Sequence, residues 1–277
     1  MSVNVPVPVQ PTLALGTARF VGRRLRDWVP AAAFLVLGLV AWQVLVSVLS
    51  IQRFLLPKPT QIASAFWNER HSLWSAGWFT FQEAVGGFVI GSAVAILVGL
   101  VLARWKPLRS AVMPYAIAAN AVPIIAFAPI TNAWFSPLSK SSKIAIAAVL
   151  CFFPVLVNTI RGLTSVRPES IELMRSYAAG EVEIFRRVRV PAALPYIFTA
   201  LKVASVLAMI GAIVGEYFGG SIEALGVQIK NSASLFQFET AWAAILVASL
   251  LGIAFYLAVA LAERIVTRWQ PTPGRGE

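Results

Sequence analysis

The stretch that decides the fold is YIFTALKVASVLAMIGAIVGEYF, Tyr196–Phe218. It is apolar almost throughout and carries two ionisable residues, Lys202 toward one end and Glu216 close to the other. The hydrocarbon core of a bilayer is about 30 Å thick, and an α-helix crosses it with roughly 17–25 apolar residues. A barrel strand would instead alternate polar and apolar residues over roughly ten positions. The stretch therefore predicts a transmembrane helix.

Five more apolar runs of similar length precede or follow it. They are Val29–Leu49, Phe79–Ala103, Ala111–Thr131, Ile144–Ile160 and Ala241–Ala262. The composition agrees, with 58% hydrophobic and only 13% charged residues and a mean hydropathy of +0.76, whereas a soluble domain carries about a quarter charged residues. We therefore expect an all-α integral membrane protein with about six transmembrane helices. Residues 29–269 form the membrane domain, between an N-terminal tail at 1–28 and a C-terminal tail at 270–277.

The basic residues fix the expected orientation. If six helices alternate across the membrane, sixteen of the 23 lysines and arginines fall on the side of the two termini and six on the other side. Cytoplasmic loops carry the excess of basic residues, so both termini are expected in the cytoplasm of a cell whose inner or plasma membrane holds the chain. This distribution accounts for the net charge of +11 without a nucleic-acid partner.

The residues that usually build catalytic or metal sites are scarce. The chain has one cysteine, one histidine and one aspartate, namely Cys151, His71 and Asp27, and they are scattered. Cys151 stands among Leu150, Phe152 and Phe153, which favours a buried filler over a reactive thiol. We expect no catalytic residue, no metal site and no cofactor held by this chain, which argues against a membrane-embedded enzyme.

Prolines interrupt the third apolar run. Pro114, Pro123 and Pro129 each remove a backbone donor, and the carbonyls that they free must be satisfied by protein or in a water-lined cavity. A broken segment predicts a wall of a translocation pathway, while a kink that serves only helix packing is the alternative. Before the second run, Gln61–Trp74 has apolar residues at helical spacing and predicts a short interfacial helix on the outer face.

The cytoplasmic loop 161–194 is patterned as two short helices. Pro168 suits a first helical turn, and acidic residues follow it at the positive end of the helix dipole. The second helix is expected to begin at Glu181 and to end at Pro191, with three arginines in its last turns. Such a rigid hairpin, joined to membrane helices at both ends, could transmit a push from a soluble partner.

This loop resembles the coupling loop of the permease subunits of binding-protein-dependent ABC importers. Their motif has Glu-Ala-Ala, then Gly, then a hydrophobic-x-hydrophobic-Pro group. Here Glu172-Leu173-Met174 stands for the triplet, Ala178 for the Gly, and Val188-Arg189-Val190-Pro191 for the last group. Since Ala178 departs from the pattern, Gly180 is expected to supply the freedom for the turn. The resemblance implies that the residues coupled to an ATPase are Glu172, Ala178, Ala179, Gly180 and Pro191.

The resemblance extends over roughly residues 55–264. Leu56-Pro57-Lys58-Pro59, the run 120–129, Phe152-Phe153-Pro154 with Asn158, and Gly215–Gly220 look like the nitrate, sulfonate and taurine branch of these permeases, and Glu83 looks closer to permeases for thiamine-pyrimidine precursors or riboflavin. The resemblance implies the type I ABC importer permease fold, a permease homodimer, two ATPase subunits that bind ATP and Mg, and an extracytoplasmic solute-binding protein.

The sequence also lacks an ATPase motif of its own. No lysine follows a glycine anywhere, so the Gly-x4-Gly-Lys-Ser/Thr phosphate loop is absent. The expected function is thus the membrane permease of an ATP-driven importer, in which closure of the partner ATPases moves the loop. A secondary transporter or a small-solute channel that works without an ATPase is the alternative. A secondary transporter would show internal repeats, and a channel would leave the loop unexplained.

Polar residues inside the apolar runs are the candidates for the substrate pathway, because ionisable groups in a membrane are costly and often functional. The candidates are Glu83, Asn120, Asn158 and Glu216. An ionised Glu83 facing the cavity would disfavour a sulfonate or nitrate anion. It would favour a neutral or cationic solute such as a heterocyclic vitamin precursor.

Overall fold

The computed structural model describes residues 16–269, with side chains described for 29–119 and 121–269, and every regular element in this part of the chain is a helix. Five of these helices are long and apolar enough to cross a membrane, and a bent pair brings the number to six if it is counted as one span. The expected all-α membrane fold is thereby confirmed.

The chain divides into two compact units, Met1–Gln61 and Ile62–Glu277. The first unit contains helix α1, Gly16–Val48, whose membrane span is Val29–Val48. Within this unit, the side-chain amide of Gln43 hydrogen-bonds the hydroxyl of Thr60 at 3.3 Å. The predicted tails fall partly on residues 1–15 and 270–277, which lie outside the described part.

Helix α2 is a single helix, Pro59–Arg104. The prediction of a separate interfacial helix at 61–74 is therefore wrong: that segment is the outer extension of the second span. At about 1.5 Å per residue, the 46 residues exceed the hydrocarbon core about twofold, so polar residues at the outer end can lie in water without ending the helix. Glycines give α2 a close-packing face, because a Cβ atom at Gly91 would meet the backbone of Ala148 and one at Gly99 would meet Thr159 at 2.7 Å.

The third span is broken as expected. Helix α3, Lys106–Asn120, ends before Pro123; the 3₁₀ turn η1, Ile124–Ala126, follows; and α4, Phe127–Phe135, continues at a bend of 77°. Pro123 has an extended backbone and pushes the preceding residue away from helical angles. Pro114, by contrast, lies inside α3 without ending it.

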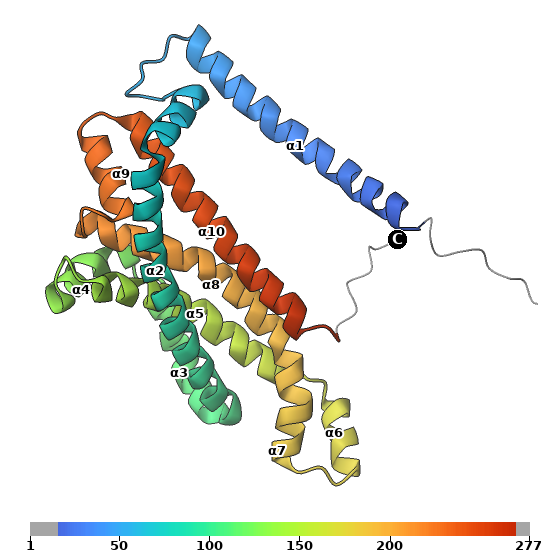
Figure 1. Ribbon diagram of the computed structural model, residues 1–277. Coiled ribbons are helices and arrows are strands. Elements are labelled where there is room, and N and C mark those ends of the chain that lie inside the picture. Colours follow the sequence, from blue (N-terminus) through green and yellow to red (C-terminus); the bar gives the residue numbers. More distant parts are fainter. Residues whose placement is uncertain (1–15, 270–277) are drawn as a thin grey trace, which may run out of the picture. The chain divides into compact units, whose positions relative to one another are not determined.

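Helices α5 and α8 form the centre of the second unit, where they lie side by side (Figure 1). The bounds are Lys140–Thr164 for α5 and Val190–Phe218 for α8. Small residues let the two backbones approach, since a Cβ atom at Gly211 would stand 2.8 Å from the Cα of Ala147. Cys151 is fully buried in this contact, and its thiol lies 3.3 Å from the carbonyl oxygen of Ala204.

Helices α9, Leu225–Ser234, and α10, Phe238–Val266, pack against α8. Lys202 of α8 pairs with Glu263 of α10 at 2.6 Å, and both side chains are mostly buried. The charge inside the fifth span is thereby satisfied by a carboxylate on the neighbouring helix.

The loop after α5 folds into a helical hairpin. Its elements are α6, Pro168–Ser176, α7, Glu181–Ile184, and a π-helical turn η2, Phe185–Arg189. The expectation that the second helix ends at Pro191 is wrong, because η2 continues directly into α8. Pro191 follows directly after the π turn, where the N–H of Val190 donates to the carbonyl of Phe185, and this wider turn accommodates a residue without a backbone N–H inside the run.

Candidate functional site

The helical hairpin projects beyond one end of the spans (Figure 1). Its tip exposes apolar side chains, with Leu173 58%, Tyr177 76% and Val182 81% exposed. Charged residues surround them: the ion pair Arg175–Glu181, at 2.8 Å, connects the two arms. Glu172 is exposed, and within the described chain no ion pair engages it. An apolar patch in a charged frame is typical of a surface that binds another protein.

The turn of the hairpin depends on Ala178. The N–H of Ala179 donates to the carbonyl of Met174 at 3.1 Å, and the N–H of Ala178 donates to that of Arg175 at 2.9 Å. This is the Schellman pattern, which places one residue in the left-handed region. Ala178 occupies that place with φ of 57°, whereas Gly180 has φ of −72°. The prediction that Gly180 supplies the turn is therefore wrong.

A second group of polar residues is buried near the other end of the spans. Glu216 of α8 accepts hydrogen bonds from the hydroxyl of Thr80 and from the N–H of Gly226, both at 2.7 Å. The Thr80 hydroxyl accepts in turn from the N–H of Leu225 at 3.0 Å. The first two amides of α9 thus find their acceptors on α2 and α8. Glu216 holds three helices together and also places a negative charge at a positive helix end.

Glu83 and Lys143 complete this group, and each is 1% exposed. Glu83 lies beside Glu216, and the buried Lys143 belongs to the same group without an ion pair to either carboxyl group within 4.0 Å among the described residues. Lys143 also donates to the carbonyls of Pro137 and Ser139. One oxygen of Glu83, Oε2, has no hydrogen-bond partner among the described residues.

The burial of Glu83 bears directly on the predicted charge selectivity of the pathway. Glu83 does not face an open cavity in this conformation, because its side chain is 1% exposed. A carboxyl group that is enclosed by protein in this way gives no reason to reject anions in the pathway. The substrate preference derived from Glu83 alone therefore loses its premise, while the place of Glu83 and Glu216 in the pathway stays a prediction.

The two asparagine candidates lie away from this group. The side-chain amide of Asn158 donates to the carbonyl of Pro154 within its own helix at 2.8 Å. The side chain of Asn120 lies outside the described residues. The structure brings Glu83 and Glu216 together and does not bring Asn158 to them.

The sequence of the second unit matches a known family. The model of the family described as "binding-protein-dependent transport system inner membrane component" matches residues 87–268. The chain belongs to this family. It is therefore a multi-pass inner-membrane permease subunit of a transport system, and the hairpin lies inside the matched range.

Several curated relatives are similar over most of the permease. The riboflavin transport system permease protein RibX of Chloroflexus aurantiacus is 33% identical over 85% of this chain and 88% of its own length. The formylaminopyrimidine transport permease protein ThiX of Halalkalibacterium halodurans is 35% identical over 87% and 95%. The putative aliphatic sulfonates transport permease protein SsuC of Escherichia coli is 30% identical over 89% and 95%. The permease is thus an ABC importer subunit.

A solved structure shares the fold. The MetNI methionine ABC transporter, in an inward-facing conformation, matches with a TM-score of 0.55 and 21% identity over 74% of the permease and 96% of the matched chain. The implied type I ABC importer permease fold is confirmed by this likeness together with the family.

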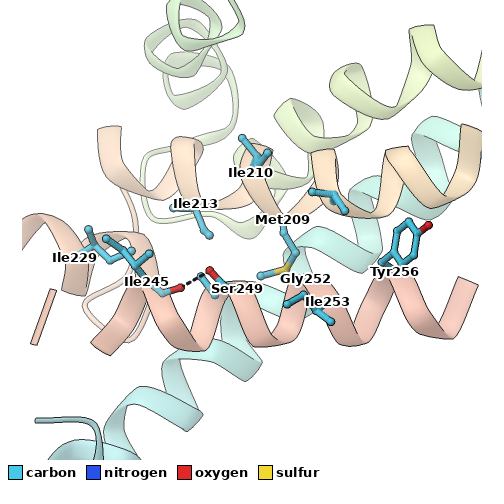
Figure 2. Close-up of a pocket in the computed structure, with 11 residues that line it drawn as sticks. Met209, Ile210, Ile213, Ile229, Ile245, Ser249, Gly252, Ile253 and Tyr256 are labelled. Carbon is cyan, nitrogen blue, oxygen red and sulfur yellow. Dashed lines mark hydrogen bonds between the residues drawn. The ribbon is translucent and has the colours of Figure 1, made fainter. Parts of the chain in front are cut away.

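An apolar groove of about 490 Å³ lies between α8 and α10 of the permease (Figure 2). Its lining contains no charged residue, and the hydroxyl of Ser249 donates to the carbonyl of Ile245 in its own helix at 2.9 Å. An apolar lining of this kind suits contact with lipid or with another apolar helix. It holds no charged group to recognise the polar atoms of a nutrient.

Sequence reasoning missed part of the buried polar group. Lys143 was expected only as one of the outer basic residues, and the structure places it in the first turn of α5 and buries it. Thr80 and Ser142 were not singled out; Ser142 hydrogen-bonds Asn132 and Thr131 of α4. The available signal was weak: Lys143 stands directly before the apolar run 144–160, and a threonine or serine inside a span is common.

Proposed function

We propose that the permease forms the translocation pathway of an ATP-driven importer as one of two identical copies. Two partner ATPase subunits bind ATP and Mg, and an extracytoplasmic binding protein delivers the solute. The hairpin 168–191 receives the movement of the ATPases and passes it to the membrane helices. Glu172, Ala178, Ala179, Gly180 and Pro191 belong to this hairpin.

The observation that carries this proposal is the continuity of the hairpin with a membrane span. Residues 181–218 form one uninterrupted helical run, so a displacement of the exposed tip acts directly on α8. Helix α8 packs along α5 and α10 and holds α9 through Glu216. A push on the tip therefore reaches both ends of the membrane domain without crossing a flexible linker.

The distribution of charge supports the orientation. The loop 161–194 carries six arginines, four of them in the hairpin, and it lies on the same side as the basic residues between α2 and α3. The positive-inside bias places this side in the cytoplasm, where ATPase subunits operate. Both termini are then cytoplasmic.

For the substrate we propose a heterocyclic vitamin or vitamin precursor. The support is the identity of 33% and 35% to permeases named for riboflavin and for formylaminopyrimidine. An aliphatic sulfonate is the second candidate, because the relative named for sulfonates is 30% identical over a similar length.

Uptake into vesicles tests both parts of the proposal. The permease is reconstituted with its ATPase subunits and binding protein, and accumulation of riboflavin, formylaminopyrimidine and an alkyl sulfonate is measured with and without ATP. We expect ATP-dependent accumulation of one heterocycle and none of the sulfonate. Accumulation of the sulfonate alone would refute the substrate class, and accumulation that ignores ATP would refute the importer mechanism.

A bulky hairpin variant adds a test of coupling. Ala178→Trp should leave ATP hydrolysis running while uptake falls, because the tip can no longer seat in its partner. The matched control is Leu261→Trp, at an exposed position near the cytoplasmic end of α10, which should change neither. Unaltered coupling in Ala178→Trp would count against the hairpin as the transmission element.

A further inference from the structure

A small cavity of about 230 Å³ lies where α2, α3 and α5 end on the side of the hairpin. The residues that line it come from these helices and from both arms of the hairpin: Ala103, Arg104, Lys106, Arg109, Leu163, Thr164, Val166, Ile171 and Arg189. The cavity thus joins the membrane domain to the hairpin.

Four of the lining residues are cations without a carboxylate partner. None of Arg104, Lys106, Arg109 and Arg189 forms an ion pair within 4.0 Å in the described part of the chain. Glu181 is the carboxylate that acts on Arg104 and Arg189 from a distance, but its ion pair is with Arg175. Guanidinium groups gathered in one cavity without a counter-charge repel one another, and an anion would offset this repulsion.

Helix α3 adds to the positive potential. It begins at Lys106 inside the cavity, its first turn has no acidic residue, and no side chain caps its N–H groups. The positive end of a helix dipole normally faces acidic groups, so the lysine here is opposite to the usual preference. Cations and free N–H groups together are the features that bind a phosphate.

We propose that this cavity binds the phosphate group of an anionic phospholipid of the cytoplasmic leaflet. The site lies at headgroup depth: Trp105, at the start of α3, is 56% exposed, and exposed Leu108 follows one turn later. Aromatic residues mark the membrane interface, and basic pockets between helices on this side of a membrane suit lipid phosphates. The bound lipid would tie the ends of α2 and α3 to Arg189 and Ile171 of the hairpin.

Native mass spectrometry of the intact permease–ATPase complex tests this site. The complex is titrated with dioctanoyl phosphatidylglycerol, with dioctanoyl phosphatidylcholine and with inorganic phosphate. We expect the wild type to retain phosphatidylglycerol in preference to both. Arg104→Gln combined with Arg109→Gln should weaken retention by about 25-fold, since each of the two basic residues contributes about fivefold at an anionic surface.

Two further double variants make the result specific. Arg264→Gln with Arg268→Gln removes two exposed arginines at the cytoplasmic end of α10, away from the cavity, and should retain the lipid as wild type does. Arg104→Lys with Arg109→Lys keeps the charge and should also retain it. Equal weakening in the α10 variant or loss in the lysine variant would overturn the site. Equally tight binding of inorganic phosphate would overturn the lipid source, and release of the ATPase subunits by the glutamine variant would assign the cavity to protein docking instead.

Discussion

Ala178 holds the turn of the hairpin in a conformation that favours glycine. A non-glycine residue in the left-handed region costs about 1–2 kcal/mol, and Ala178 has φ of 57°. Ala178→Gly should therefore stabilise the hairpin by about 1 kcal/mol and slow amide hydrogen exchange across 174–184 about fivefold. The control Ala179→Gly, at the next position, should give no such protection, and equal exchange in wild type and Ala178→Gly would show that the turn is not strained.

Glu216 is the residue on which the outer end of the membrane domain depends. Its removal leaves the Thr80 hydroxyl and the Gly226 N–H without their acceptor, and each buried unsatisfied donor costs about 1–3 kcal/mol. Glu216→Ala should thus lower the free energy of unfolding by about 3 kcal/mol, seen as a lower midpoint in thermal unfolding of the purified protein. Glu223→Ala, which removes an exposed carboxylate after the same helix, should leave the midpoint unchanged. A midpoint that falls equally in both variants would contradict the capping role.

At the scale of elements, the break between α3 and α4 depends on Pro123. Because proline holds the preceding residue away from helical angles, Pro123→Ala should let α3 extend and reduce the 77° bend. We expect slower uptake in reconstituted vesicles with a protein that still folds and assembles. Pro114→Ala lies inside α3, where the helix already continues, and should transport at the wild-type rate. Normal uptake by Pro123→Ala would assign the break to packing alone.

The elements differ in how far the sequence could predict them. The spans were predictable because long apolar runs require lipid as their solvent. A break in the third span was predictable from its three prolines, but its position at Pro123 was not, since Pro114 and Pro129 lie inside helices. The extent of α2 was not, since the apolar residues at helical spacing in 61–74 indicated a separate interfacial helix rather than the outer turns of one helix. The continuation of the helix through Pro191 into α8 could not be predicted either, because it depends on the π turn at 185–189.

The sequence identified two residues of the buried polar group but not the contacts between its residues. Glu83 and Glu216 stood out as carboxyl groups within apolar runs, but Thr80 and Glu216 are separated by 136 positions. Their contact follows from the packing of α2 on α8, and nothing in the local pattern specifies it. The same holds for Lys143, whose burial is set by α5 lying at the centre of the unit.

At the scale of the whole molecule, one short hairpin is proposed to connect the membrane domain to the partner ATPase subunits. Family membership establishes a permease subunit, and the uninterrupted run 181–218 gives it a mechanical connection. Under the proposed function, the two ends of α8 have different tasks: the hairpin end receives the movement, and the other end, through Glu216 and α9, carries it to the opposite face.

Cross-linking from the hairpin tip tests this claim most directly. In a Cys151→Ala background, Tyr177→Cys is labelled with a benzophenone maleimide and irradiated in the intact membrane assembly, and adducts are identified by mass. The account predicts an adduct with an ATPase subunit, and none from Ile222→Cys, an exposed position before α9. Absence of an ATPase adduct from the tip, or its appearance only from position 222, would contradict it.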